Sequence, residues 1–309
     1  MSQVGLAAVV SGTATQEPVR GNSLARAKAY YELTKPGIAL FVVITVSVSY
    51  YVAAAGVLDL MRVLHTVLGA AMGTAGALAL NQYVERDLDA RMKRTKTRPL
   101  PSGRLRPTEA LAFGIVLVVG GVGYLFWQVG WIPASLTLLS AAAYILAYTP
   151  LKTRSYIATL VGAIPGAIPA LIGWSAATEG LAVGAFVLCA IAFLWQLPHV
   201  LALAWLLRED YERVGFFLMP PTDAEGGRIG KHMVYHSVSL LTVSVFPTLL
   251  GLTGLYYLGG AIVLGLTMIA VCVGAARDMT PGHARRVFLY SLLYQPLLLG
   301  LMVIDTIRS

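Results

Sequence analysis

The sequence predicts an all-α, polytopic membrane protein with about nine transmembrane helices. Of its 309 residues, 57% are hydrophobic and only 12% are charged, and the mean hydropathy is +0.72. A soluble domain carries about 25% charged residues, so a water-soluble globular fold is excluded. The apolar stretches are long enough to cross a bilayer as helices. Cys189 and Cys272 both lie inside such stretches, which argues against a disulfide framework or a cysteine-based metal site.

Nine apolar stretches are the expected spans. They comprise residues 38–55, 63–80, 110–128, 134–147, 157–175, 181–207, 235–255, 258–275 and 287–304. Residues 32–309 therefore form the transmembrane domain, and residues 1–31 form a polar tail. The tail lacks the apolar core of a signal peptide, so we expect it to be mobile and cytoplasmic and to end in an interfacial helix.

Polar residues, glycines and prolines mark the boundaries in order along the chain. Pro36 and Gly37 precede the first span, and a short turn at residues 56–62 separates the first two. Two prolines and a glycine in residues 98–103 rule out a helix there. A tight turn at residues 130–133 and a basic loop at residues 148–154 flank the fourth span. Pro165 and Pro169 then kink or interrupt the fifth, and Pro198 lies in the sixth.

The basic residues predict the orientation of the chain. With these spans, every lysine and arginine except Arg62 and Arg308 falls on one side of the membrane, and an aromatic belt marks the other. The N-terminus and the two polar loops, residues 86–108 and 208–231, are therefore expected to be cytoplasmic, with the C-terminus on the opposite side. Membrane topology accounts for the net charge of +8 better than nucleic-acid binding does.

A charged motif directly follows the second span. Asn81, Glu85 and Asp89 recur every four residues, so on a continuing helix they share one face. An amide and two carboxylates offer the oxygen ligands that Mg²⁺ prefers, and a run of basic residues suited to phosphate follows. On an unbroken helix Asp87 points about 200° away from Glu85. The alternative is a solvated helix end with surface ion pairs.

A second acidic cluster follows the sixth span, on the same expected side. It contains Arg208, Glu209, Asp210 and Tyr211. The two clusters lie four spans apart, which suggests a duplicated helical unit with two facing motifs. A metal–phosphate site at a membrane surface, with an apolar chamber behind it, predicts an amphipathic substrate such as an isoprenoid diphosphate.

Aromatic and histidine side chains are further candidates for the site. Tyr83, Tyr148, Tyr211 and Trp195 could present π-faces to an allylic cation, or could serve only in packing. His199 lies in an otherwise apolar span and could bind haem or lie beside it, act as a base, or hydrogen-bond another helix. His232 and His236 have the i, i+4 spacing of a metal pair, but no third ligand is evident, so an interfacial role is favoured.

These motifs resemble the UbiA superfamily of intramembrane prenyltransferases, and within it the family that farnesylates protohaem IX. The first motif of that family, an asparagine with acidic residues at four-residue steps, is matched by Asn81, Glu85 and Asp89. Further resemblance lies in residues 32–36, 97–103, 148–152, 162–174, 195–199 and 208–211, in Gly215 and in the pair Met219-Pro220.

The resemblance implies nine helices around a central cavity, in the cytoplasmic (inner) membrane of a bacterium. It implies a Mg²⁺-dependent reaction of farnesyl diphosphate with haem b and water to give haem O, with a downstream haem A synthase as a candidate partner. Carried over by position, the metal ligands would be Asn81, Glu85, Asp89 and Asp210; the diphosphate partners Lys35, Arg94, Arg98, Lys152 and Arg208; the haem-side residues Trp195 and His199. Asn81, Glu85, Asp89, Tyr148 and His199 would be catalytic.

The second motif departs from the superfamily pattern. Leu207 and Tyr211 occupy the positions where relatives usually carry two aspartates, which leaves a second Mg²⁺ site open. A sister prenyltransferase acting on a quinone precursor or chlorophyllide is the nearest alternative. A transporter is a more distant one, because the acidic groups gather at one membrane face rather than at the midplane.

Overall fold

The computed structural model describes residues 23–218, 223 and 225–307, and within them every regular element is a helix. The pair Met219-Pro220 and the tail residues 1–22 lie outside the described residues. The helices are α1 Ser23–Leu33, α2 Pro36–Ala53, α3 Leu60–Asp89, α4 Pro107–Gln128, α5 Trp131–Ala142, the π-helix η1 Ala143–Tyr148, α6 Thr149–Leu151, α7 Ala158–Thr178, α8 Val183–Leu206, α9 Arg208–Val214, α10 Gly227–Ser244, α11 Phe246–Leu249, α12 Leu255–Arg277 and α13 Pro281–Ile304.

Eight helical segments in the described part of the chain are long and apolar enough to span a membrane, which confirms the predicted class. They are α2, α3, α4, the continuous segment Trp131–Leu151, α7, α8, α12 and α13. The predicted seventh span, residues 235–255, corresponds to α10, whose bounds differ most from expectation. Asp223 accepts hydrogen bonds from the backbone N–H groups of Arg228 and Ile229, so the helix starts earlier than expected. It ends at Ser244, just before Pro247.

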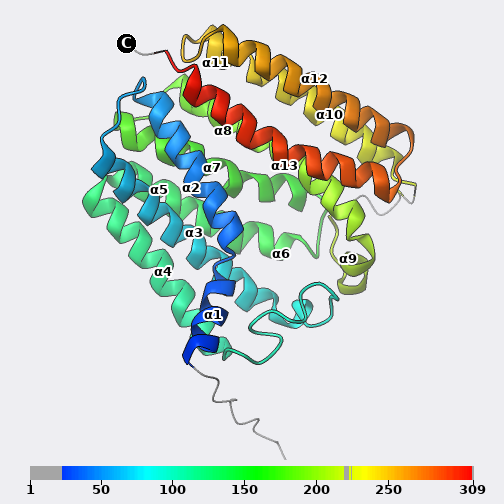
Figure 1. Cartoon of the computed structure of the whole chain (residues 1–309). Helices are drawn as coiled ribbons and strands as arrows, with labels where there is room; N and C mark the ends of the chain where they lie inside the picture. The colour runs from blue at the N-terminus through cyan, green and yellow to red at the C-terminus, as the bar shows by residue number, and fades with distance from the viewer. Residues whose placement is uncertain (1–22, 219–222, 224, 308–309) are drawn as a thin grey trace, which may run out of the picture.

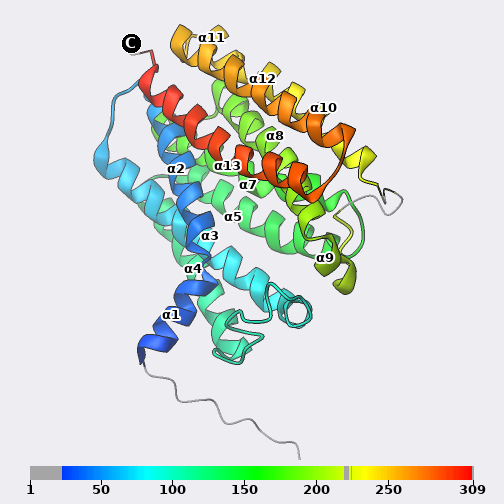
Figure 2. The ribbon, with the colours of Figure 1, turned by 45° about the vertical axis from the view of Figure 1, so that its right-hand side comes forward.

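The helices form two halves joined by a central pair (Figures 1 and 2). In one half α8, α10, α12 and α13 pack against one another, and in the other α3, α4 and α5 do. Helices α2 and α7 pack on each other between the halves. The loop after α3, the helix α9 and α1 lie at one end of the bundle, with α11 and the C-terminus at the other. The charged motif at the end of α3 and the second acidic cluster in α9 therefore lie at the same end of the bundle, as expected.

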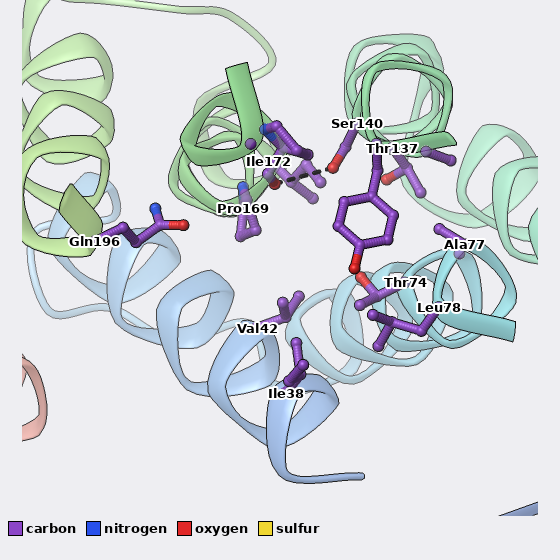
Figure 3. A pocket seen from close by; sticks show the side chains of 16 residues that line it. Ile38, Val42, Thr74, Ala77, Leu78, Thr137, Ser140, Pro169, Ile172 and Gln196 are labelled. Carbon is purple, nitrogen blue, oxygen red and sulfur yellow. Dashed lines mark hydrogen bonds between the residues drawn. The ribbon is translucent and has the colours of Figure 1, made fainter. Parts of the chain in front are cut away.

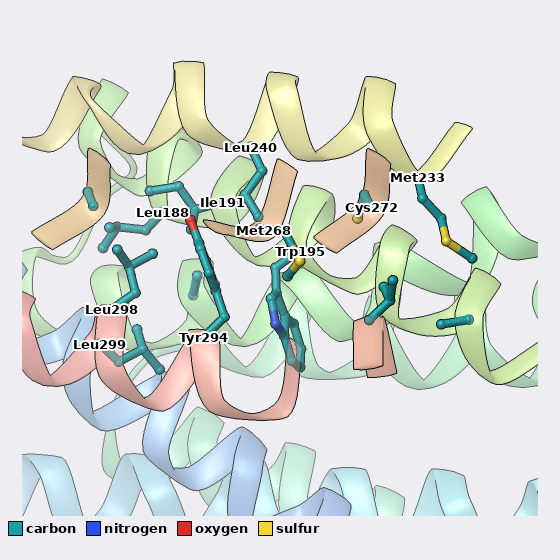
Figure 4. Packing of buried hydrophobic residues seen from close by; sticks show 14 of the residues in the cluster. Leu188, Ile191, Trp195, Met233, Leu240, Met268, Cys272, Tyr294, Leu298 and Leu299 are labelled. Atoms are coloured by element: carbon teal, nitrogen blue, oxygen red, sulfur yellow. The ribbon is translucent and has the colours of Figure 1, made fainter. Parts of the chain in front are cut away.

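The largest buried cluster lies in the half built on α8. Figure 4 shows Leu188 and Ile191 of α8 facing Leu240 of α10 and Leu298 of α13. In the other half, α3 and α4 approach closely through glycines: a Cβ added at Gly76 would lie 2.7 Å from the carbonyl oxygen of Gly114. Small residues permit such close backbone contact in membranes, where apolar burial alone does not drive helices together.

The predicted fourth span contains a π-helix that the sequence pattern did not reveal. Residues Ala143–Tyr148 form wider turns between α5 and α6. The rings of Tyr144 and Tyr148 come within 5.4 Å of each other, centroid to centroid. Such π-bulges often occur at functional sites, because they displace side chains from the regular helical face. Pro165 and Pro169, by contrast, lie inside α7 without interrupting it.

Candidate active site

The face of α3 that carries the first motif is buried. Because α3 continues without a break to Asp89, the side chains of Asn81, Glu85 and Asp89 share one face, and these residues are 1%, 4% and 0% exposed. The side chain of Asp87 is 83% exposed and pairs with Arg86 at 3.7 Å. The expectation that Asp87 points away from Glu85 is confirmed.

Each of these buried groups meets a cation from a different segment of the chain. Glu85 Oε1 accepts a hydrogen bond of 2.6 Å from Lys152 Nζ. The carboxylate oxygens of Asp89 lie 2.8 and 2.7 Å from Nη1 of Arg98. Asn81 Oδ1 accepts a hydrogen bond of 3.3 Å from Lys35 Nζ. We call Lys35, Asn81, Glu85, Asp89, Arg98 and Lys152 the polar cluster.

Local structure aims the three cations at α3. Lys35 adopts a left-handed backbone conformation, with φ of 45°, in the turn between α1 and α2. Arg98 lies in the turns after α3, where the Thr95 hydroxyl donates to the carbonyl oxygen of Asp89. Lys152 directly follows α6, and its carbonyl oxygen accepts the N–H of Phe217. The cluster thus depends on three connections that lie far apart in the sequence.

Burial and neighbouring groups shift the pKa of two of these cations. The pKa of Lys35 is lowered to about 7 by burial of its ammonium group and by the positive charges of Arg98 and Lys152. Burial also lowers the pKa of Lys152, but the neighbouring Tyr148 and Glu85 raise it by more, so the net shift is upward. Three cations face two carboxylates, and an added anion would favour the charged form of Lys35.

Tyr144 and Thr149 also belong to the site, although neither was singled out from the sequence. Asn81 Nδ2 donates to Thr149 Oγ1 at 3.1 Å, and the Tyr144 hydroxyl lies 3.5 Å from Asn81 Oδ1. The π-helix brings Tyr144 to α3, and α6, which follows it directly, brings Thr149. Tyr148, which was predicted, lies under Lys152, whose Nζ is 4.4 Å from the ring centroid. In the sequence, the feature that could have identified Tyr144 is its position four residues before Tyr148.

An apolar pocket begins where the polar cluster ends. We call it the chain pocket; it encloses about 690 Å³ of empty space, part of it open to the outside. Figure 3 shows Ile38 and Val42 of α2, Leu78 of α3 and Pro169 of α7 lining it. Tyr144 lines it too and so connects the pocket to Asn81. The pocket reaches Gly73, eight residues or about 12 Å along α3 from Asn81.

The second motif contacts the first through the loop after α3. The carboxylate of Asp210 accepts the backbone N–H groups of Lys93 and Arg94 at 3.2 and 3.3 Å and pairs with Arg213 at 3.0 Å. Asp210 therefore ties α9 to that loop, and its neighbour Glu209 is exposed. The two acidic motifs, which were expected to face each other, thus meet through the loop that follows α3.

Two predicted diphosphate partners lie outside the polar cluster. The side chain of Arg94 is exposed, and only its backbone N–H bonds to the second motif. The guanidinium of Arg208 lies 4.7 Å from the ring centroid of Trp205 and donates to the carbonyl oxygen of that residue. Lys35, Arg98 and Lys152 are therefore the predicted cations that the fold brings to the first motif.

Trp195 and His199 pack between α8 and α13. His199 Nδ1 lies 2.8 Å from the Ser291 hydroxyl, and Trp195 Nε1 donates to the Ser291 carbonyl oxygen at 2.7 Å. The imidazole stacks between Trp195 and Phe288, and Trp195 stacks on Phe41. The helix-to-helix hydrogen bond is thus present, and the haem-side role of both residues stays a prediction. Their neighbour Gln196 points into the chain pocket (Figure 3).

The oxygen atoms of the polar cluster fit a hard divalent cation. Glu85 uses one carboxylate oxygen in its ion pair, and each oxygen of Asp89 retains a lone pair beside Arg98. Among the described residues, no three histidine, cysteine or acidic side chains lie close enough together to hold a metal ion by themselves. The two carboxylates and Asn81 would therefore share a metal with oxygen atoms of a ligand, as Mg²⁺ sites that bind phosphates commonly do.

Comparison with known proteins shows which sequences and folds this chain is similar to. Residues 42–294 match the UbiA prenyltransferase family. The chain is 41% identical to the protoheme IX farnesyltransferase of Solibacter usitatus, over 89% of this chain and 98% of that protein. A solved structure described for digeranylgeranylglyceryl phosphate synthase matches with a TM-score of 0.77 at 17% identity, covering 91% of this chain and 99% of that one. A UbiA homologue from Archaeoglobus fulgidus bound to GPP and Mg²⁺ matches with a TM-score of 0.56 at 14% identity, covering 89% and 99%.

Proposed function

The chain belongs to the UbiA prenyltransferase family, and from this membership and the site we propose that it transfers a farnesyl group from farnesyl diphosphate to a vinyl group of protohaem IX. Water adds in the same reaction, so the product is haem O, which serves haem–copper oxidases. The proposal takes the acceptor from the relative of Solibacter usitatus described above, whose name is protoheme IX farnesyltransferase.

One observation carries the donor part of the proposal: a cation-rich polar cluster stands at the mouth of an apolar pocket. A prenyl diphosphate has the same division, with a charged head and an apolar tail. Asn81 and Tyr144 lie at the junction, because Tyr144 touches both the cluster and the pocket. The head would bind Lys35, Arg98 and Lys152, and the tail would extend along α3 toward Gly73.

The cations of the cluster favour loss of the diphosphate. The bond between the allylic carbon and the diphosphate oxygen breaks, and negative charge grows on the leaving group, where Lys35, Arg98 and Lys152 can stabilise it. Mg²⁺, held by Asn81, Glu85 and Asp89, would supply further positive charge to the departing diphosphate. The Glu85–Lys152 and Asp89–Arg98 ion pairs hold carboxylates and cations side by side. The groups for the metal and the groups for the diphosphate are therefore in place before the substrate binds.

The remaining steps need an apolar chamber that tolerates positive charge. The allylic cation bonds to the terminal carbon of the vinyl group, which leaves a cation on the carbon next to the porphyrin. Water captures that cation and loses a proton. Tyr144 is the aromatic residue best placed to face the first cation, because it lines the chain pocket. The face of Tyr148 is already covered by Lys152.

We place the polar cluster at the cytoplasmic side of a bacterial inner membrane. The basic residues gather at the end of the bundle that carries α1, α9 and the loop after α3, and positive residues favour the cytoplasmic side. A charged diphosphate made in the cytoplasm would then reach the site without crossing the bilayer.

The direct test is the mass of the haem product. Purified protein with Mg²⁺, farnesyl diphosphate and haem should form a haem heavier by one farnesyl group plus one hydroxyl group, and a metal chelator should stop the reaction. Consumption of farnesyl diphosphate with a quinone precursor or chlorophyllide, but not with haem, would favour a sister prenyltransferase. Solute movement in proteoliposomes without any consumption of farnesyl diphosphate would overturn the enzyme assignment.

We expect the ring of Tyr144 to matter more than its hydroxyl. A cation over an aromatic face gains about 0.5–2 kcal/mol, so Tyr144→Leu should lower kcat by up to about 30-fold. Tyr144→Phe keeps the π-face and loses only a long 3.5 Å contact with Asn81, so it should stay within about threefold of the wild type. Steady-state rates at saturating donor check this. Equal losses in both variants would assign the role to the hydroxyl.

The depth of the chain pocket should set the preferred length of the prenyl tail. Ile172 of α7 lines the pocket and is 2% exposed. Ile172→Ala removes part of the pocket wall, so use of geranylgeranyl relative to farnesyl diphosphate should rise by about tenfold. Ile164→Ala changes an exposed side chain of the same helix and should leave the ratio unchanged. An unchanged ratio in both variants would show that the tail lies elsewhere.

A further inference from the structure

The chain pocket has an apolar wall in which a few side chains carry polar atoms. They are Thr74, Thr137, Ser140, Tyr144 and Gln196. The hydroxyls of Thr137 and Ser140 donate to the backbone carbonyl oxygens of Pro133 and Pro165, so their protons are already used. Gln196 of α8 differs, because its amide has separate donor and acceptor atoms. Figure 3 shows this amide at the edge of the pocket, with its oxygen atom directed inward.

Two hydrogen bonds fix the orientation of the Gln196 amide. Its Nε2 donates to the carbonyl oxygen of Ala192, one turn earlier on α8, at 2.8 Å, and to that of Ala163 on α7 at 3.4 Å. Because carbonyl oxygens can only accept, the NH₂ group must face them and Oε1 must face away. In the part of the chain that the structure describes, no donor hydrogen-bonds to Oε1. Gln196 therefore presents a fixed, free acceptor to the chain pocket.

Glycines of α7 determine where this acceptor lies. A Cβ added at Gly166 would overlap Oε1 of Gln196, so the oxygen atom fits against α7 only because residue 166 has no side chain. Gly162, one turn or about 5.4 Å earlier on α7, lies in the same way against the ring of Tyr148. That ring carries Lys152 of the polar cluster. The amide oxygen is thus about one helical turn further from the polar cluster than Tyr148.

A free acceptor in an apolar pocket calls for a small hydrogen-bond donor, because an unpaired buried acceptor is unfavourable. A prenyl tail has no donor, whereas a water molecule has two and is small enough to lie beside a tail. The reaction consumes one water. Its second cation forms two bonds away from the allylic carbon and therefore close to the departing diphosphate. A turn beyond the edge of the polar cluster is within the reach of a few covalent bonds from that point.

We propose that Gln196 is a catalytic residue that holds, through Oε1, the water that captures the second cation. This inference rests on the proposed function. One O–H group of the water donates to Oε1, which directs an oxygen lone pair at the cation. A C–O bond forms at the carbon next to the porphyrin, the other O–H bond breaks, and its proton passes to the released diphosphate. No oxidation state changes, and Gln196 stays neutral throughout.

The same cation has a second fate when no water is held in place. It can lose a proton from the neighbouring carbon, which gives an alkene that is lighter than the hydroxylated product by one water molecule. The ratio of alkene to hydroxylated haem therefore reports on the water site itself. Both products require the same earlier loss of diphosphate, so consumption of farnesyl diphosphate reports separately on the steps before capture.

Mass analysis of the haem products from full-length variants tests the proposal. Gln196→Met keeps the length of the side chain and removes the acceptor, so the ratio of alkene to hydroxylated haem should rise by about fivefold or more. Gly166→Ala retains the amide but displaces its oxygen, so the ratio should shift in the same direction. Consumption of farnesyl diphosphate should stay within about threefold of the wild type in both variants.

Two matched controls make the same exchanges elsewhere in the chain. Gln128→Met replaces an exposed glutamine at the end of α4, and Gly123→Ala adds a methyl group where open space surrounds the glycine. Both should give the product ratio of the wild type. An equal shift of the ratio in these controls would contradict a specific water site at Gln196.

An unchanged ratio in Gln196→Met and Gly166→Ala, with farnesyl diphosphate still consumed, would overturn the proposal. If the melting temperature of Gln196→Met also fell, the amide would serve only to join α8 to α7. Should Gln196→Met fail to fold, Gly166→Ala decides the question alone. Failure of the proposed function is distinguishable, because the wild type would then form no farnesylated haem, hydroxylated or not.

Discussion

Replacing Asp89 with asparagine should lower turnover by about 10²–10³-fold, one of the two largest effects that we expect in this protein. Asp89 is fully buried on the cluster face of α3, and both of its carboxylate oxygens lie within 2.8 Å of Nη1 of Arg98. The amide of asparagine keeps the size of the side chain but removes the negative charge that would bind Mg²⁺ and orient Arg98. Release of diphosphate at saturating substrates, measured over a range of Mg²⁺ concentrations, checks the prediction.

Asp87 is the matched control for this experiment. It lies two residues earlier on the same helix, and its side chain is 83% exposed. Because exposed ion pairs contribute about 0–1 kcal/mol, Asp87→Asn should change turnover by no more than about fivefold. If Asp89→Asn retained more than a tenth of the wild-type rate, or if both variants lost activity equally, the metal role of the α3 face would be wrong.

The second large effect concerns the buried pair of Lys152 and Glu85. The side chains are 9% and 6% exposed, and the charged atoms lie 2.6 Å apart. Lys152→Met leaves the Glu85 carboxylate buried without its cation, so the free energy of unfolding should fall by about 3–5 kcal/mol. Turnover should also fall by about 10²-fold or more, because one of the three cations that face the leaving diphosphate is lost. Unfolding of the purified protein in detergent measures the first effect.

A double variant separates the two roles of this pair. Glu85→Gln combined with Lys152→Met removes both charges, so most of the lost stability should return while activity stays low. The exposed pair of Arg26 and Glu109 has a similar distance of 2.7 Å and serves as the control. Arg26→Met should leave both stability and activity close to those of the wild type, because exposed ion pairs are weak. A double variant that regained activity along with stability would show that the pair is only structural.

The spans and the face of the first motif followed from local features of the sequence. Apolar length predicted the transmembrane helices, because a helix in lipid satisfies its own backbone hydrogen bonds wherever it packs. The four-residue spacing of Asn81, Glu85 and Asp89 predicted their shared face and the outward direction of Asp87, because helical period is a property of a single element. The excess of basic residues at one end of the bundle was likewise predicted from the sequence, without knowledge of contacts between helices.

Only the tertiary structure decided which groups meet. Lys152 lies 67 residues from Glu85 in the sequence, and no local rule pairs them, since the pairing depends on how α6 packs against α3. The π-helix that brings Tyr144 to Asn81 leaves no mark in hydropathy. The pocket lined by His232 and His236 of α10 and by Leu160 of α7 and Leu197 of α8 likewise depends on how these helices pack. Spans and faces are set by neighbours along the chain, whereas ion pairs and cavities are set by contacts between distant helices.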